Sequence, residues 1–180
     1  MSTTEQHPMS PYEPVTLDKK AVAVSQLELA LELWFQYADL ASIHTLAAAS
    51  HNVFAALGKQ IGAPSLIKEH LKGVSKTEYD RFTKAEVFFK HAARDLNKTI
   101  DYDPMHAEIL MLDSIEIYEA IYSDKTTTML VFIIYFALKH PNYFDLTELF
   151  RPPVPTGFSP ENFIDLNRTD FLTKFRPFIE

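Results

Sequence analysis

The chain contains no cysteine and only four glycines among its 180 residues. The absence of cysteine excludes disulfide bonds, cysteine zinc sites and thiolate catalysis. The shortage of glycine argues against glycine-rich phosphate loops, and no G-x-x-x-x-G-K, G-x-G-x-x-G or G-x-S-x-G pattern occurs. The usual nucleotide-binding and serine-hydrolase motifs are therefore missing, and we expect no cofactor.

Basic residues are also scarce, since 17 Lys and Arg face 24 Asp and Glu, for a formal net charge of −7. Domains built to bind nucleic acid over their whole surface usually carry a cationic excess, so an extended RNA track is not expected. The longest apolar run, Met129–Leu138, has ten residues, against the roughly 20 that cross a bilayer as a helix. We therefore expect a cytoplasmic protein with no membrane partner.

Apolar residues recur at spacings of three and four along most of the chain, which is the period of a helical face. The sequence predicts long helices over residues 16–39, 42–61, 75–91, 104–122 and 126–140, a short segment of unspecified structure at 65–71 and a short amphipathic helix at 169–175. No strand-like alternation of useful length competes with them. The sequence therefore predicts an all-α fold, a bundle of about five helices.

The two ends of the chain differ from this bundle. Residues 1–15, with three prolines and no apolar run, are expected to form a flexible N-terminal arm, and residues 16–140 the helical bundle. Residues 141–180 are irregular and rich in Pro and Phe. Because an exposed segment with this much Phe would favour aggregation, we expect it to pack on the bundle. The first helix carries a second apolar line of Val22, Leu29 and Leu33, which predicts a homodimer interface.

Helix termini are marked by local signals. Ser42 is expected to cap the second helix, and Ser75 with Glu78 forms a capping-box pattern at the start of the helix over 75–91. Only two residues separate the first two helices, which predicts an antiparallel hairpin.

The densest polar group is Lys90, His91, Arg94 and Asp95, where the helix over 75–91 ends. His91 and Arg94 are three residues apart and can share a face, and Asp95 can orient the His91 ring. An imidazole beside a guanidinium can bind an anion or transfer a proton at a phosphate. The same cations are also favoured at any helix C-terminus, so a purely structural role stays open.

His44 and His51 are seven residues apart on the second helix and project within roughly 20° of each other. In the antiparallel hairpin, His51 is expected to face Glu28 and Glu32. A row of His and carboxylate side chains can hold a metal in a helical bundle, although no Glu-x-x-His pair occurs here. The alternative is an ordinary hydrogen bond between His51 and a Glu.

Three acidic residues, Asp113, Glu116 and Glu119, repeat at spacings of three on the fourth long helix. Such a row is typical of a solvated helix face. We expect no catalytic role for it.

Together these residues give a first functional hypothesis, a helical binding protein. Its polar recess would hold a small anionic ligand or a carboxylate of a protein partner. The residues assigned to that recess are His44, His51, Lys90, His91, Arg94 and Asp95. A metal-binding bundle that uses Glu28, Glu32, His44 and His51 is a weaker alternative.

Residues 42–49 (SIHTLAAA) and 88–95 (FFKHAARD) resemble signature segments of a family of small, largely uncharacterised bacterial all-α proteins. Residues 132–141 are similar to the C-terminal helix of that family, so the resemblance covers about residues 18–144. Val87 stands where the family pattern has Asn, and Ala93 where it has Asp. The resemblance implies a small helical protein and assigns no reaction.

A more distant resemblance is to the HEPN superfamily, whose catalytic members are metal-independent ribonucleases that act as dimers. Their motif is an Arg followed, after four to six residues, by a His. Here His91 precedes Arg94, and Arg81 lies ten residues before His91. The resemblance implies, as the alternative function, a divergent ribonuclease or toxin–antitoxin component with His91 as acid/base and Arg94 stabilising phosphate charge. Whether the protein is an enzyme stays open at this point.

Overall fold

The computed structural model describes residues 14–90, 97–142 and 162–178, which form seven α-helices and no strand. The five longer helices are α1 (Lys19–Phe35), α2 (Leu40–Gln60), α4 (Lys76–Lys90), α5 (Met105–Tyr122) and α6 (Thr127–Lys139). The two shorter ones are α3 (Leu66–Gly73) and α8 (Arg168–Phe175), and a 3₁₀ turn, η3 (Arg176–Phe178), follows α8. The predicted all-α class is confirmed. The expected count of about five corresponds to the longer helices, the short helix predicted at 169–175 corresponds to α8, and the structure adds α3.

Side-chain caps fix where these helices begin. Asp39 caps α2 by accepting a hydrogen bond from the Ser42 amide at 2.8 Å, so the prediction that Ser42 is the cap was wrong. Asp and Ser are similarly good N-cap residues. Asp39 precedes Ser42 in the chain, so the helix begins at the earlier of the two possible caps. The capping box of α4 is confirmed, because the Ser75 amide donates to Glu78 Oε2 (3.0 Å) and the Glu78 amide donates to Ser75 Oγ (3.3 Å).

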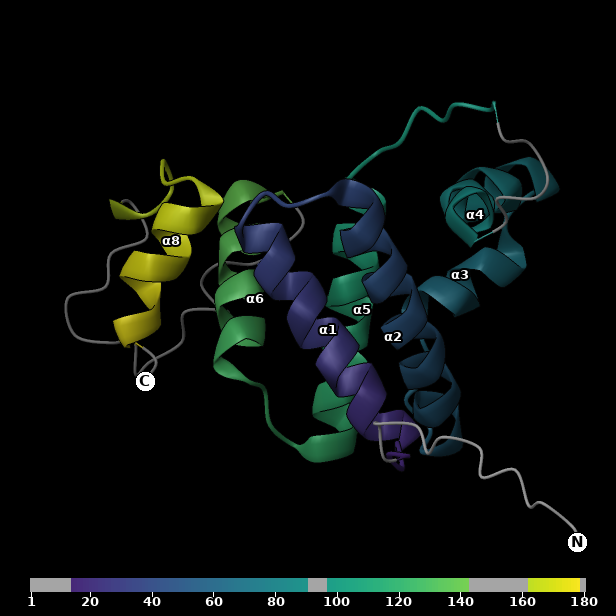
Figure 1. Cartoon of the computed structure of the whole chain (residues 1–180), viewed down its shortest axis with the longest axis horizontal. Coiled ribbons are helices and arrows are strands. Elements are labelled where there is room, and N and C mark those ends of the chain that lie inside the picture. The colour runs from purple at the N-terminus through teal and green to yellow at the C-terminus, as the bar shows by residue number, and fades with distance from the viewer. Residues whose placement is uncertain (1–13, 91–96, 143–161, 179–180) are drawn as a thin grey trace, which may run out of the picture.

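The central layer of the molecule consists of α1, α2, α5 and α6. Helices α1 and α2 run in opposite directions side by side, as the two-residue link predicts, and α2 also packs along α5 (Figure 1). Gly58 has no room for a side chain, since a Cβ there would lie 2.2 Å from the Ala63 carbonyl oxygen and 2.8 Å from Ile117 Cγ2 on α5. The largest fully buried side chains of the core are Phe35, Phe54, Phe132, Phe171, Phe175, Leu27, Leu31, Ile43, Met111, Ile115 and Met129.

Helix α8 lies on the outer side of α6 and α1 (Figure 1). The Arg168 guanidinium stacks 3.8 Å from the centre of the Trp34 ring and contacts Glu108 Oε1 at 3.0 Å. Trp34 Nε1 donates to the same Glu108 oxygen at 2.9 Å. Buried Glu108 is thus paired, and this cluster joins α8 to α1 and α5.

Helices α3 and α4 stand on the opposite side of the molecule, beyond α2 (Figure 1). No residue of α3 is buried, and Ala85 is the buried residue of α4. These two helices therefore form a thin cover over the side of α2 that faces away from α6.

The second apolar line of α1 is only partly covered. Leu29 is 44% exposed, whereas Val22 and Leu33 are half-buried. The homodimer through this face stays a prediction. Within the described residues, we find no helix with both the length and the apolar character needed to cross a membrane.

Candidate functional site

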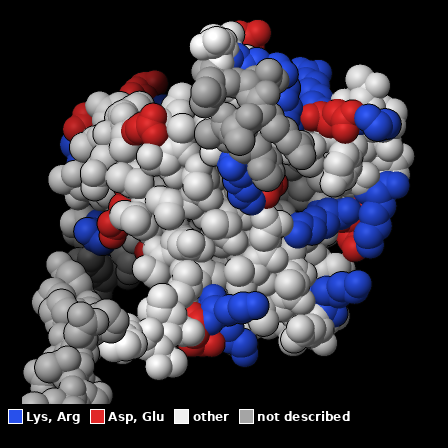
Figure 2. All heavy atoms as spheres, turned by 45° about the vertical axis from the view of Figure 1, so that its right-hand side comes forward, with Lys and Arg blue, Asp and Glu red and all other residues white. Residues whose placement is uncertain are grey.

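A cavity of about 480 Å³ lies between α2, α3, α4 and the start of α5. One part of its wall is apolar, and the other part is polar and includes three histidines. In Figure 2, which brings this side of the molecule forward, Lys and Arg side chains, with Asp and Glu among them, lie around a broad uncharged area. The apolar lining residues are Ile67, Leu71, Phe82 and Leu110, and the polar ones are His44, His51, Asn52, Lys68, Lys72, Tyr79, Thr83, Glu86 and His106.

His44 is the most deeply buried polar group of this cavity, with 2% of its surface exposed. Its Nδ1 lies 3.1 Å from the Tyr102 hydroxyl, and its ring packs against Phe89 and Tyr102. Within the described parts of the chain, its Nε2 has no hydrogen-bond partner. Burial lowers the pKa of His44 to about 4, outweighing the opposite effect of Glu86, so the ring is neutral near pH 7.

His106, in the first turn of α5, also has a ring nitrogen that is buried and, among the described residues, unpartnered. Its Nδ1 is buried and lacks a hydrogen-bond partner in the described residues. Its ring centre lies 5.2 Å from that of Phe82 and 6.4 Å from that of Tyr102. Buried polar atoms are nearly always hydrogen-bonded in folded proteins, so two unpartnered imidazole nitrogens on one cavity wall are unusual.

His51 belongs to a buried network that anchors α3. Its Nε2 lies 2.7 Å from Asp113 Oδ2 and 3.2 Å from Ser65 Oγ, and Ser65 Oγ donates to the same Asp113 oxygen at 2.5 Å. Asp113 Oδ1 and Ser65 Oγ then accept hydrogen bonds from the Leu66 and Lys68 amides, which caps α3. Burial would raise the pKa of Asp113, but these hydrogen bonds outweigh it and hold the pKa below its ordinary value.

The residue types Ser65, His51 and Asp113 are those of a catalytic triad, but the geometry is different. In a triad the two ring nitrogens of the histidine bridge the serine and the aspartate. Here one nitrogen, Nε2, contacts both residues, and Ser65 donates its proton directly to Asp113. This network therefore holds α3 in place and does not activate Ser65 as a nucleophile.

A second polar chain crosses the wall from α4 to α3. Glu86 pairs with Lys90 and also accepts a hydrogen bond from Asn52 Nδ2 at 3.1 Å. Asn52 Oδ1 in turn accepts from Lys68 Nζ at 2.9 Å. Burial would raise the pKa of Glu86, but its contacts with Lys90 and Asn52 outweigh it and lower the pKa. Glu86 is therefore ionised at neutral pH.

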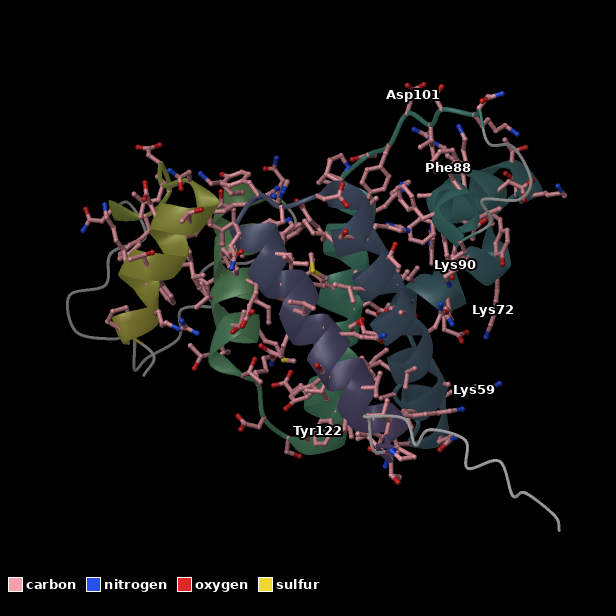
Figure 3. All side chains as sticks on the ribbon, viewed as in Figure 1. Lys59, Lys72, Phe88, Lys90, Asp101 and Tyr122 are labelled. Carbon is pink, nitrogen blue, oxygen red and sulfur yellow. The ribbon has the colours of Figure 1, made fainter. Side chains whose placement is uncertain are left out.

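The cavity also lies on the basic side of an acidic protein. Within residues 59–98, the part that the structure describes contains eight Lys and Arg against four Asp and Glu. Lys72 on α3 and Lys90 on α4 both lie on the side of the bundle beyond α2 (Figure 3). The potential on this side therefore favours an anion more than the net charge of −7 indicates.

The predicted site residues are brought together only in part. His44 and His51 line the same cavity, and Lys90 reaches that wall by pairing with Glu86. The other residues assigned to the recess, His91, Arg94 and Asp95, lie outside the described residues.

The predicted neighbours of His51 were wrong. His51 pairs with Asp113 of α5, whereas Glu28 of α1 accepts a hydrogen bond from Thr126 Oγ1 and Glu32 is exposed. The apolar side of α2 packs on α1. The histidine side of α2 therefore faces α5 and α4, away from Glu28 and Glu32. Among the described residues, no group of three or more His, Asp or Glu side chains is placed to hold a metal ion, so the metal site from Glu28, Glu32, His44 and His51 is not formed.

Sequence reasoning also missed several members of the site. Asp113 was expected on a solvated face, but it is buried, whereas Glu116 and Glu119 are exposed. The available signal was its place within the apolar run Leu110–Ile115, where a lone carboxylate needs a partner. His106 and Tyr102 carried no such signal, because their role comes from the packing of α4 and α5 around His44.

Comparisons with models of known protein families, with curated proteins and with solved structures found no match to this chain.

Proposed function

We propose that this chain is a binding protein for a small organic anion, which it holds in the cavity between α2, α3, α4 and α5. The observation that carries this proposal is that two histidines lining that cavity each keep a buried ring nitrogen, His44 Nε2 and His106 Nδ1, without a hydrogen-bond partner among the described residues. Leaving a buried polar atom without a partner costs about 1–3 kcal/mol. A ligand that supplies the missing hydrogen bonds would recover that free energy.

The size and the composition of the cavity support this proposal. A volume of about 480 Å³ falls within the range of roughly 300–1,000 Å³ that is usual for small-molecule sites. Such sites combine apolar walls with a few polar groups that orient the ligand. Here Ile67, Leu71, Phe82 and Leu110 supply the apolar wall.

The basic surroundings support an anion in particular. Lys68 and Lys72 line the cavity, and the segment that carries them has an excess of cations. Electrostatic attraction over this side would raise the local concentration of an acidic molecule and speed its association.

A titration of isotope-labelled protein tests the proposal. We would add benzoate, benzamide and benzylamine separately and follow backbone amide resonances around the cavity. Benzoate is expected to shift resonances of α2, α3 and α4, with the amide and the amine shifting them less. His44→Leu should weaken the benzoate response, whereas His70→Leu, which changes an exposed histidine of α3, should not. No response around the cavity to any of the three compounds, or the same benzoate response in His44→Leu, would contradict the proposal.

A further inference from the structure

We propose that the ligand of this cavity is an elongated organic monoanion. Its carboxylate would lie at Lys68, its apolar body between α3, α4 and α5, and a hydrogen-bond acceptor at His44 Nε2. This inference rests on the proposed binding function and specifies the chemical class of the ligand.

The two polar ends of the cavity are separated along α2. Lys68 Nζ is held by the side chain of Asn52, and Asn52 lies eight residues after His44. At 1.5 Å per residue, this places the two positions about 12 Å apart along the helix axis. The His44 end adjoins Tyr102, just before α5, whereas the Lys68 end adjoins the start of α3. A ligand that satisfies both ends must therefore be long rather than compact.

The charges that line the cavity leave one positive charge unbalanced. Glu86 is neutralised by Lys90, and Lys72 by Glu69, whose oxygen lies 2.5 Å from Lys72 Nζ. In the described part of the chain, Lys68 forms no ion pair, and its hydrogen bond goes to the neutral amide of Asn52. One free ammonium matches a ligand with a single negative charge.

The lining also favours a carboxylate over a phosphate. A phosphate monoester carries about 1.5 to 2 negative charges at pH 7, whereas a carboxylate carries one, which the single free ammonium of Lys68 balances. An ammonium group held by one amide is a point charge, which a carboxylate oxygen can reach beside Asn52. The Lys68 end therefore fits a carboxylate.

The proton of the neutral His44 ring can be placed from its neighbours. Burial raises the pKa of Tyr102 to about 12, so its hydroxyl keeps its proton at neutral pH. We assign the Tyr102 hydroxyl as the donor to His44 Nδ1, which lies 3.1 Å away. An imidazole that accepts at Nδ1 carries its hydrogen on Nε2. On this assignment His44 carries a donor at Nε2, and the ligand atom that pairs with it must be an acceptor.

The wall between the two ends is apolar. Phe82 and Leu110 line it near the histidines, and Ile67 and Leu71 line it along α3. The Phe82 ring is tilted by 44° against the His106 ring, with 5.2 Å between their centres. A flat apolar body, such as a benzene ring that carries its two polar groups at opposite ends, suits these walls.

The test uses three matched probes on the full chain at pH 7.5. 4-Acetylbenzoate has the carboxylate and the acceptor, 4-isopropylbenzoate has the same shape without the acceptor, and 4-acetylbenzamide has the acceptor without the charge. We expect 4-acetylbenzoate to bind about three- to tenfold more tightly than either of the others, which is the usual worth of one hydrogen bond. Dissociation constants would be measured by calorimetry.

Variants assign each preference to its residue. Lys68→Met should remove the preference for the acid over the amide and leave the preference for acetyl over isopropyl. His44→Leu should do the reverse. His44→Gln should keep the acetyl preference because its side-chain amide is still a donor, which separates a lost hydrogen bond from a damaged fold. Lys59→Met, on the last turn of α2 and outside the cavity, should keep both preferences.

The outcomes separate this inference from the proposed function. Equal affinity of the acetyl and isopropyl acids for the unmodified protein, or an acetyl preference that survives His44→Leu, would overturn the inference while leaving anion binding in place. Binding of benzoate alone, with no response to the longer acids, would also overturn it. Failure of every acid, benzoate included, to bind in the cavity would remove the proposed function as well.

Discussion

The two sides of α2 bury very different groups. Toward α1 and α6 the core is apolar and aromatic, with Trp34, Phe35 and Phe132 in edge-to-face contact. Toward α4 and α5 the same helix buries His44 and His51 beside a cavity. Close packing on the apolar side stabilises the fold, whereas unsatisfied polar atoms on the cavity side destabilise it. Such a loss of stability is tolerated most readily where the unpartnered polar groups bind a ligand.

The largest effect should come from the aromatic side. Phe132→Ala removes a fully buried ring that contacts Trp34 at 4.8 Å and Phe136 at 6.1 Å between ring centres. We expect a loss of about 4 kcal/mol in the free energy of unfolding, measured with urea. Phe82→Ala is the matched change on the cavity side, where the ring is half-buried, and should cost less than about 2 kcal/mol. Equal losses would erase the difference between the two sides.

Asp113→Ala tests whether the polar network is the main stabiliser of the cavity side. It leaves His51, Ser65 and the Leu66 amide without their common acceptor. Breaking such a buried pair should cost about 3 kcal/mol. Glu116→Ala, one turn along on the exposed face of α5, is the control and should change stability by less than about 0.5 kcal/mol. A loss no larger than that of the control would mean that α3 is held by other contacts.

Arg168→Ala is expected to have a smaller effect, about 2 kcal/mol, because it removes both the stacking on Trp34 and the partner of buried Glu108. Arg168→Lys should recover only part of the loss, since an ammonium cannot stack as a planar guanidinium does. Lys174→Ala, exposed on the same helix, is the control for thermal unfolding. Full recovery by Lys would show that only the charge matters here.

A further prediction is a pH dependence of stability from His44, which is small near neutral pH and grows as the pH falls. Its pKa in the folded protein is about 4, below the ordinary 6.5, so between these values the unfolded chain binds more protons. The contribution of His44 to stability should therefore fall as pH drops from about 6.5 toward 4, by at most about 1.4 kcal/mol per pH unit. Above pH 6.5 it should be constant. His44→Gln should reduce the slope of the free energy of unfolding against pH between pH 7 and 5. The control, His70→Gln, should leave this slope unchanged. An unchanged slope in His44→Gln would mean that another group takes up the proton on unfolding.

Much of the fold could be predicted from the sequence. Apolar spacing together with helix start and stop signals located every long helix, and the short helix predicted at 169–175 corresponds to α8. Residues 65–71 were predicted only as a short segment, where the structure has α3. Helix starts were less certain because Asp39 and Ser42 are both good caps, and only the backbone geometry shows which one the helix uses.

The site was predictable only where it follows from one helix. His44 and His51 share a face because they are seven residues apart, and that geometry holds whatever surrounds α2. Their partners depend on which side of α2 faces α5, and no local pattern encodes that choice. Asp113 was recognisable as a carboxylate in an apolar run, whereas the cavity itself arises from the loose packing of α3 and α4 over α2.

The most direct test of the ligand site is the imidazole nitrogen spectrum of the full chain during a titration with 4-acetylbenzoate. Without ligand at pH 7.5, we expect His44 to be neutral, with its hydrogen on Nε2. Ligand should shift the His44 Nε2 resonance in proportion to saturation and leave that of exposed His70 unchanged. A hydrogen on Nδ1 instead, or an Nε2 resonance that does not move when ligand is bound, would contradict the assignment of His44 as the donor that recognises the ligand.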